Sequence, residues 1–105
     1  MNAAQLARDI GLEEADCLEL LDLFAQTTRS DLTAIAEAVT SGDAQKAVSA
    51  AHSIKGAAAN LGLGDIADEA RTIEERSREG RLGEIGDAVQ ALETHLASLL
   101  RSLKE

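Results

Sequence analysis

Residues 51–62, in the middle of the chain, read AHSIKGAAANLG. Read as an α-helix at 100° per residue, the stretch has two different faces. One face is an apolar stripe that starts one turn earlier and consists of Ala47, Ala51, Ile54, Ala58 and Leu61. The opposite face carries His52, Lys55, Gly56 and Ala59 at the spacing i, i+3, i+4, i+7. The pattern predicts an amphipathic helix whose histidine points away from the core.

Gly56 stands beside this histidine on the same face. A glycine inside a helix costs about 1 kcal/mol relative to alanine. Such a glycine often has a packing or functional reason. Here the missing side chain would clear the approach to the imidazole of His52.

The rest of the chain predicts further helices separated by short turns. We expect a short helix from Ala3 to Ile10 and long helices from about Glu13 to Thr40, from Asp43 to Asn60, from Asp65 to Arg78 and from Glu84 to Leu103. Gly11 and Gly42 can end helices, and the side chains of Asn2, Asp43 and Asp65 can cap helix starts. The patch Thr27-Thr28-Arg29-Ser30 is a point where the long helix could bend.

Apolar residues recur at helical spacing in these segments too. In the long helix they include Leu18, Leu21, Phe24, Ala25, Leu32, Ile35, Ala36 and Val39. The fourth segment has Ile66, Ala70 and Ile73, and the last has Ile85, Val89, Leu92, Leu96, Leu99 and Leu103. Short connections make sequential helices antiparallel neighbours. We therefore expect an all-α fold, an antiparallel up-down four-helix bundle with a short additional N-terminal helix.

Composition agrees with such a bundle and excludes several functions. The 105 residues suffice for a single domain, 1–105, and they contain one aromatic residue, Phe24, and no proline. A sheet would favour β-branched and aromatic residues instead. The net charge of −9 argues against binding to nucleic acid or to an anionic membrane, both of which need clustered Lys and Arg.

Location and assembly follow from similar arguments. Cys17 is the single cysteine, so no internal disulfide can form, and we expect it to be a small buried side chain. No apolar run reaches the roughly 18 residues of a membrane helix, and the N-terminus has no basic start followed by an apolar block. We expect a cytoplasmic protein. Four helices can close their own core, which favours a monomer, and Met1 with a full bundle favours a free-standing protein.

The residues around His52 resemble a known family. His-x-x-Lys-Gly, preceded by Ala51 and followed by Leu61-Gly62, is similar to the active-site helix of histidine-containing phosphotransfer (HPt) domains. The run Ala51 to Gly56 is also similar to the phosphorylated N-terminal domain of chemotaxis-type histidine kinases. The likeness covers most of the chain, because the helix pattern on both sides of the motif fits as well.

The resemblance implies roles for three residues, and the helix that carries one of them offers a fourth candidate. A histidine near neutrality has a free ring nitrogen that can attack phosphorus, and the family makes His52 the phosphoacceptor. Lys55 would balance the charge of the phosphoryl group, as a lysine does at this position in HPt domains. Glu74 lies 22 residues after His52, where related domains have a Glu or Gln that binds and orients the histidine. Arg71 is a further candidate for contact with the phosphoryl group or the partner.

Three of these residues also have a structural interpretation. His52 can be an exposed helix histidine without a role, Lys55 a solvated surface charge, and Glu74 a surface partner of Arg78 at i, i+4. His95 has no lysine and glycine near it, so we interpret it as structural or as a surface residue. Two histidines and one cysteine without an i, i+4 pair do not predict a zinc site.

The leading hypothesis is a phosphocarrier of a two-component phosphorelay. His52 would take a phosphoryl group from a phospho-aspartate receiver domain or a sensor histidine kinase and pass it to a receiver aspartate. The receiver, and not this chain, would supply Mg²⁺. Leu6, Ile10 and Leu18 are candidates for the docking surface. The chain has no ATP-binding motif and should not phosphorylate itself. The alternatives are a kinase-substrate domain of the chemotaxis type and a helical scaffold or adaptor without phosphotransfer.

Overall fold

Helices make up almost all of the structure, a computed structural model that describes residues 3–103. In chain order they are α1 (Ala3–Ile10), α2 (Glu14–Ser41), α3 (Ala44–Asn60), α4 (Gly64–Arg78), the 3-10 turn η1 (Leu82–Glu84) and α5 (Gly86–Leu103). Within this part of the chain there is no strand, so the all-α prediction is confirmed. The predicted cap Asn2 lies outside the described residues.

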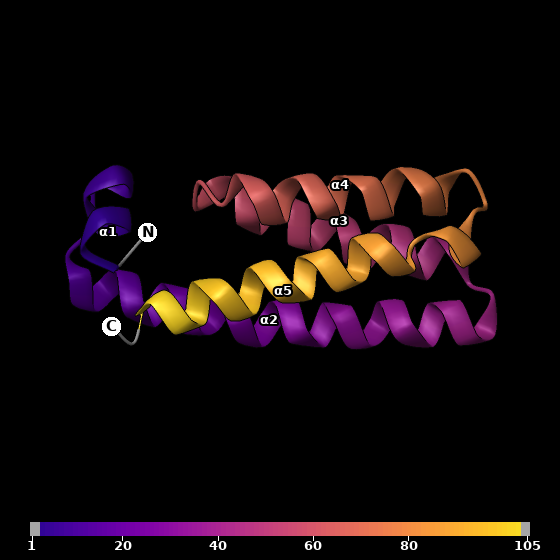
Figure 1. The fold of residues 1–105 in the computed structure, drawn as a ribbon, viewed down its shortest axis with the longest axis horizontal. Coiled ribbons are helices and arrows are strands. Elements are labelled where there is room, and N and C mark those ends of the chain that lie inside the picture. The colour runs from indigo at the N-terminus through magenta and orange to yellow at the C-terminus, as the bar shows by residue number, and fades with distance from the viewer. Residues whose placement is uncertain (1–2, 104–105) are drawn as a thin grey trace.

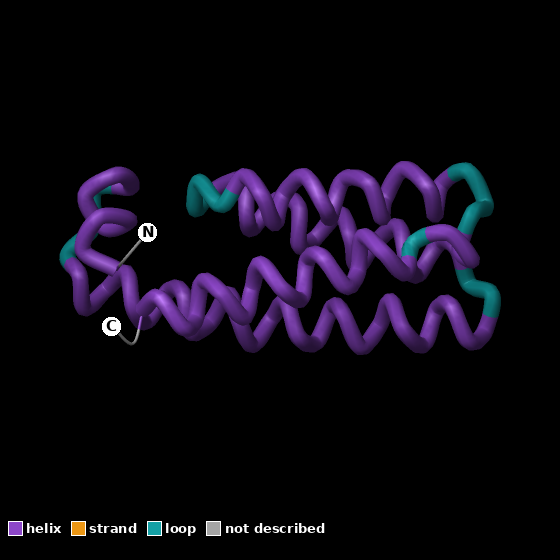
Figure 2. The backbone as a smooth tube through the Cα atoms, viewed as in Figure 1, coloured by secondary structure: helices purple, strands orange, loops and turns teal. Residues whose placement is uncertain are grey.

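The four long helices lie lengthwise beside one another, and α1 crosses one end of them (Figure 1). The turns between α2, α3, α4 and α5 alternate between the two ends of the molecule, so each helix runs antiparallel to the one before it (Figure 2). The result is a rod with extents of 42 × 21 × 18 Å. α3 packs most extensively against α4 and next against α2, whereas α2 and α5 contact each other little. The predicted up-down bundle with an additional N-terminal helix is confirmed.

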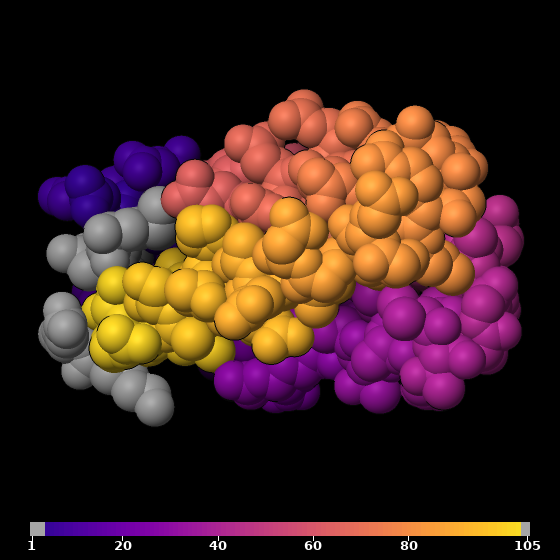
Figure 3. All heavy atoms as spheres, turned by 45° about the vertical axis from the view of Figure 1, so that its right-hand side comes forward, coloured from indigo at the N-terminus to yellow at the C-terminus, as the bar shows by residue number. Residues whose placement is uncertain are grey.

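One hydrophobic core runs between these helices. Its largest fully buried apolar side chains are Leu6, Leu21, Ile35, Ile54, Ile73, Ile85 and Leu92. Burying a Leu or Ile side chain contributes about 1.5–3 kcal/mol. The predicted stripes of α3 and α4 are all buried, and their alanines let the two backbones approach closely. In the space-filling view, α5 fills the face between α4 and α2 (Figure 3).

The turn between α2 and α3 forms as the sequence predicts. Gly42 has φ +72° in the left-handed region, which favours glycine because it has no Cβ. Its backbone N–H donates to the carbonyl of Ala38. The carboxylate of Asp43 accepts from the backbone N–H of Lys46 at 3.1 Å and caps α3. These two residues align the start of the helix that carries His52.

Two predicted helix starts are wrong. α4 begins at Gly64, one residue before the predicted cap Asp65, because the buried Leu63 occupies the flanking position. Asp65 instead lies in the first turn, where the helix dipole stabilises a negative charge. α5 begins at Gly86 and not at Glu84, because η1 intervenes. Arg76 holds this turn by donating to the carbonyl oxygen of Glu84 at 2.7 Å.

α2 differs from its predicted pattern in two respects. It is one continuous helix through residues 27–30, where Thr28 is buried and no bend is needed. Among its predicted apolar positions, Leu18, Ala36 and Val39 are exposed. Near the end of α2 the buried positions are instead Ile35 and Ala38. Within the described residues, no helix is long and apolar enough to span a bilayer.

Candidate functional site

His52 and Lys55 lie one turn apart on the outer side of α3. Their neighbours Ala51 and Ile54 are buried, which turns the imidazole outward as the helical pattern predicted. The side chain of His52 is 67% exposed, and that of Lys55 is 33% exposed. The ring is therefore open to a partner molecule, while the lysine lies at the edge that faces α4.

Glu74 of α4 is brought level with His52 by the hairpin geometry of α3 and α4. Leu63, in the turn, lies eleven residues after His52 and eleven residues before Glu74. Each helix advances by about 1.5 Å per residue, so both residues lie roughly 16 Å from the turn along their own helix axes. The side chain of Glu74 is only 5% exposed. The structure thus places a nearly buried carboxylate beside an exposed imidazole.

The carboxylate of Glu74 contacts three basic side chains. Its Oε2 lies 3.0 Å from Nδ1 of His52 and accepts a hydrogen bond from Nη2 of Arg78 at 3.0 Å. Its Oε1 accepts a hydrogen bond from Nζ of Lys55 at 2.6 Å. The predicted pairing of Glu74 with His52 is therefore present, and so is its surface pairing with Arg78. Both oxygens are occupied, which compensates the burial of the charge.

The electrostatics keep Glu74 ionised. Burial by itself raises the pKa of the Glu74 carboxyl, but hydrogen bonds from Lys55 and His52, together with the positive charge of Lys55, outweigh burial and lower that pKa overall. An ionised carboxylate can only accept hydrogen bonds, so Nδ1 of His52 must be the protonated nitrogen in this contact. The lone pair of the neutral ring then lies on Nε2, which the contact with Glu74 leaves free to react.

Gly56 is exposed and lies one turn after His52. A Cβ added there would meet no heavy atom within 4 Å apart from the local backbone. No neighbouring side chain of this protein therefore requires glycine at position 56. The open space beside the imidazole is available to a group from outside the chain.

One predicted site residue, Arg71, lies apart from this cluster. Arg71 is on α4, but its guanidinium donates to Asp68 at 2.9 Å and makes no contact with His52 or Glu74. Arg78, one turn further along than Glu74, occupies the place beside the carboxylate instead. The i, i+4 spacing of Glu74 and Arg78 was the sequence signal for this contact. The predicted contact of Arg71 with the phosphoryl group or the partner stays a prediction, and in this structure its guanidinium is paired with the exposed carboxylate of Asp68.

The expected docking residues are separated by the fold. Leu6 is 1% exposed and belongs to the core, because α1 packs its apolar side onto the bundle. Leu18 lines a groove between α2 and α5. Ile10 lines a different groove, of about 480 Å³, which is also lined by Leu12, Leu20, Leu23, Phe24, Thr27, Ala57, Asn60 and Leu61. We call this the α1–α3 groove.

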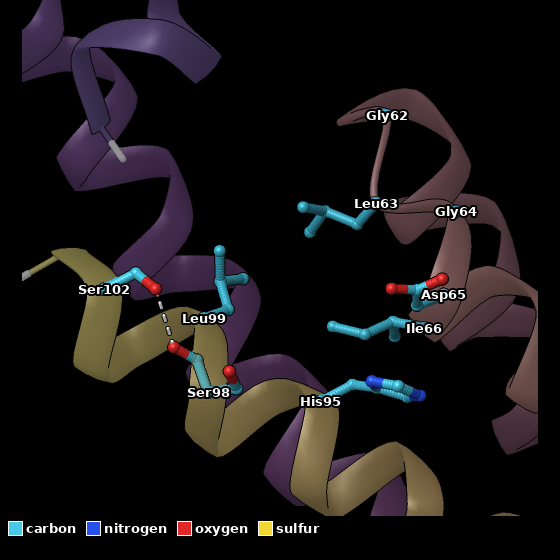
Figure 4. Close-up of a pocket in the computed structure, with 9 residues that line it drawn as sticks. All are labelled: Gly62, Leu63, Gly64, Asp65, Ile66, His95, Ser98, Leu99 and Ser102. Atoms are coloured by element: carbon cyan, nitrogen blue, oxygen red, sulfur yellow. Dashed lines mark hydrogen bonds between the residues drawn. The ribbon is translucent and has the colours of Figure 1, made fainter. Parts of the chain in front are cut away.

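The other histidine lies in a different environment. His95 of α5 is half-buried and lines a hollow between the start of α4 and the end of α5, where it lies beside Ile66 and Asp65 (Figure 4). Leu63 and Leu99 face each other across the same hollow (Figure 4). No lysine or arginine lines it. His95 thus lacks the cluster that surrounds His52. Cys17 is buried, as predicted.

No group of three or more His, Cys, Asp or Glu side chains within residues 3–103 is arranged to hold a metal ion. The cluster at His52 contains one carboxylate and three basic groups. It is therefore suited to an anion or to a group that becomes anionic, such as a phosphoryl group.

An exposed histidine on a helical bundle, oriented by a buried carboxylate, is an arrangement typical of phosphotransfer domains, and comparisons with known proteins agree. The sequence profile of the Hpt domain family matches residues 19–102. The chain belongs to this family and is a histidine phosphocarrier of phosphorelay signalling.

A solved structure gives independent support. The crystal structure of histidine-containing phosphotransfer protein B (HptB) from Pseudomonas aeruginosa PAO1 matches with a TM-score of 0.78 and 30% sequence identity. The match covers 89% of this chain and 81% of that chain. No curated protein sequence matches the chain. Domains of the Hpt family interact with receiver domains and kinases of two-component relays.

Proposed function

We propose that His52 is the phosphorylated residue of this phosphocarrier and that Glu74 orients it. The observation that carries the proposal is the contact of 3.0 Å between Nδ1 of His52 and Oε2 of the nearly buried Glu74. This contact selects the tautomer with the lone pair on Nε2, at the exposed side of the ring. The role parallels that of the carboxylate that holds a catalytic histidine in hydrolase triads.

The transfer step follows from this arrangement. The lone pair of His52 Nε2 attacks the phosphorus of an aspartyl phosphate, a nitrogen–phosphorus bond forms, and the bond to the aspartate oxygen breaks. The aspartate leaves as a carboxylate with the bonding electron pair. The ring gains positive charge and keeps its Nδ1 proton, which the carboxylate of Glu74 stabilises. The reverse reaction passes the group to a receiver aspartate.

Lys55 is the residue that we propose to bind the phosphoryl oxygens. Its ammonium lies one turn from His52, and its side chain is long and flexible enough to move from Glu74 to a group on Nε2. Gly56 leaves open space on the same face, so neither the incoming phosphoryl group nor the partner meets a side chain there.

The α1–α3 groove is the surface that we propose for the receiver domain. Ala57 and Asn60 of its lining belong to the helix of His52 and follow Gly56 by one and four residues. Leu12, Leu20 and Leu23 are large apolar side chains that remain exposed beside them. An exposed apolar patch of this kind marks an interaction site. The receiver would bring the Mg²⁺ that neutralises the phosphate.

The remaining features of the proposal concern context. We propose that the chain has no ATP site of its own and receives its phosphoryl group only from other domains. It would act as a monomer, because docking of a receiver needs the α1–α3 groove to be uncovered. A cytoplasmic location belongs to the same proposal, because the phosphoryl groups of such relays come from ATP.

Transfer of a labelled phosphoryl group tests the proposal. The wild-type protein, His52→Gln and the matched control His95→Gln are each mixed with a labelled phospho-receiver and Mg²⁺. We expect acid-labile, base-stable label on the wild type and on His95→Gln, and none on His52→Gln. Label that persists in His52→Gln would assign the wrong histidine. Binding without label on any of the three would favour a scaffold.

A further inference from the structure

Arg78 is the member of the cluster that the proposed function does not use. Its Nη2 donates to Oε2 of Glu74 at 3.0 Å, and this is the oxygen that also contacts Nδ1 of His52. Lys55 holds the other oxygen, Oε1, at 2.6 Å. One nearly buried carboxylate therefore has a permanent cation on each of its oxygens before any phosphoryl group is present.

The two cations differ in what phosphorylation would do to them. If Lys55 turns to the phosphoryl oxygens, Oε1 of Glu74 loses its short ion pair. A nearly buried carboxylate without a partner is strongly disfavoured. Arg78 is on α4, four residues after Glu74, so its contact does not depend on any residue of α3. It can stay on Oε2 while Lys55 leaves.

We propose that Arg78 is a positioning residue, which balances the charge of Glu74 and keeps Oε2 aligned with His52 Nδ1 when Lys55 moves to the phosphoryl group. This inference rests on the proposed function of His52. The two cations then have different roles. Lys55 pairs with Glu74 before transfer and binds the phosphoryl group afterwards, whereas Arg78 remains paired with Glu74 in both states.

A purely structural role makes a different prediction. Arg78 is 67% exposed, and an exposed i, i+4 pair adds little to stability. Such a pair would affect the phosphorylated and unphosphorylated proteins equally. The positioning role requires a larger effect on the phosphorylated protein, because only there is Arg78 the remaining cation on Glu74.

The first experiment measures the equilibrium of phosphoryl transfer between this chain and a receiver. Arg78→Gln should shift the equilibrium toward the phospho-receiver by roughly threefold to tenfold, the effect of one partly exposed charge-assisted hydrogen bond. Arg78→Lys keeps the charge and should restore most of the wild-type value. Arg71→Gln is the matched control on the same helix, and it should stay within about twofold because Arg71 is paired with Asp68. An unchanged equilibrium in Arg78→Gln would overturn the proposal.

A second experiment separates this proposal from the proposed function. Phosphoramidate, a small phosphoryl donor, replaces the receiver, and urea unfolding is followed for the phosphorylated and unphosphorylated forms. Arg78→Gln should raise the equilibrium constant for unfolding of the phosphorylated form by roughly threefold to tenfold more than it raises that of the unphosphorylated form. Equal effects would show a structural pair only. If receivers and kinases fail to label the wild type but phosphoramidate labels His52, the proposed function fails. The urea comparison then still shows whether Arg78 acts as a positioning residue in the phosphorylated protein. If phosphoramidate does not label His52, both proposals fall.

Discussion

Replacing Glu74 by glutamine removes the charge at the centre of the site and retains its volume. The carboxylate is 5% exposed and contacts Lys55, His52 and Arg78. Glutamine retains one acceptor oxygen, but its NH₂ group then faces a cation. We expect Glu74→Gln to lower the free energy of unfolding by about 1.5–3 kcal/mol at pH 7, the range for hydrogen bonds to charged groups. The loss stays below that of a fully buried broken pair, because Lys55 and Arg78 are partly exposed and become hydrated.

The stability difference between the wild type and Glu74→Gln should depend on pH in the direction expected for an ionised Glu74. The pKa of Glu74 is lowered in the folded protein, so its contribution to stability is complete above its unfolded pKa of about 4.3. The contribution is lost as the pH falls through the folded pKa. The difference in stability between the wild type and Glu74→Gln should therefore be full at pH 7 and narrow below about pH 4.

Urea unfolding followed by circular dichroism at several pH values between 7 and 3 measures this difference. Glu75→Gln is the matched control, since Glu75 is the exposed neighbour on the same helix. The control should remain within about 0.5 kcal/mol of the wild type at pH 7. Glu74→Gln behaving like the control at pH 7, or a difference that does not change with pH, would refute the assignment of Glu74 as the ionised centre of the cluster.

Three further substitutions address other parts of the molecule. Gly56→Ala should raise the free energy of unfolding by about 0.5–1 kcal/mol in urea titrations, because the added Cβ meets no neighbour and alanine favours helix; a loss of stability would show a hidden contact. Gly42→Ala should lower it by about 1–2 kcal/mol, because φ is +72° there; an unchanged midpoint would contradict this. Leu23→Asp changes a side chain that is 59% exposed. The urea midpoint should stay unchanged, because this side chain is not in the core. Transfer from a receiver should slow about tenfold, which corresponds to the loss of one contact of about 1.4 kcal/mol. Unaltered transfer would show that the receiver docks elsewhere.

Much of the fold was predictable because its signals are local. The apolar stripes of α3 and α4 follow directly from helical periodicity, and Gly42 and Asp43 mark a turn by the backbone chemistry of those two residues. The prediction was wrong where a residue distant in the sequence determines where a helix begins. The start of α5 depends on Arg76, which donates a hydrogen bond to the carbonyl oxygen of Glu84 in η1.

The site was predictable in part for the same reason. The facing of His52 and Lys55 is a property of one helix, so spacing alone predicts it. Spacing alone does not identify the partner of His52, because Arg71, Glu74 and Arg78 share one helix face; Glu74 is the carboxylate among them, and the family resemblance predicted it. No spacing rule separates them. Packing decides that Glu74 turns inward, that Arg78 follows it and that Arg71 pairs with Asp68.

The sequence by itself determined that this chain is a helical bundle with an exposed histidine, lysine and glycine on one helix, because helix periodicity and turn chemistry depend on neighbours within a few residues. Only the tertiary structure decided that the carboxylate of Glu74 is nearly buried beside His52 and that two cations hold its oxygens. The physical reason is that burial and ion pairing arise between helices. They depend on the antiparallel register that the turn at Leu63 imposes on α3 and α4.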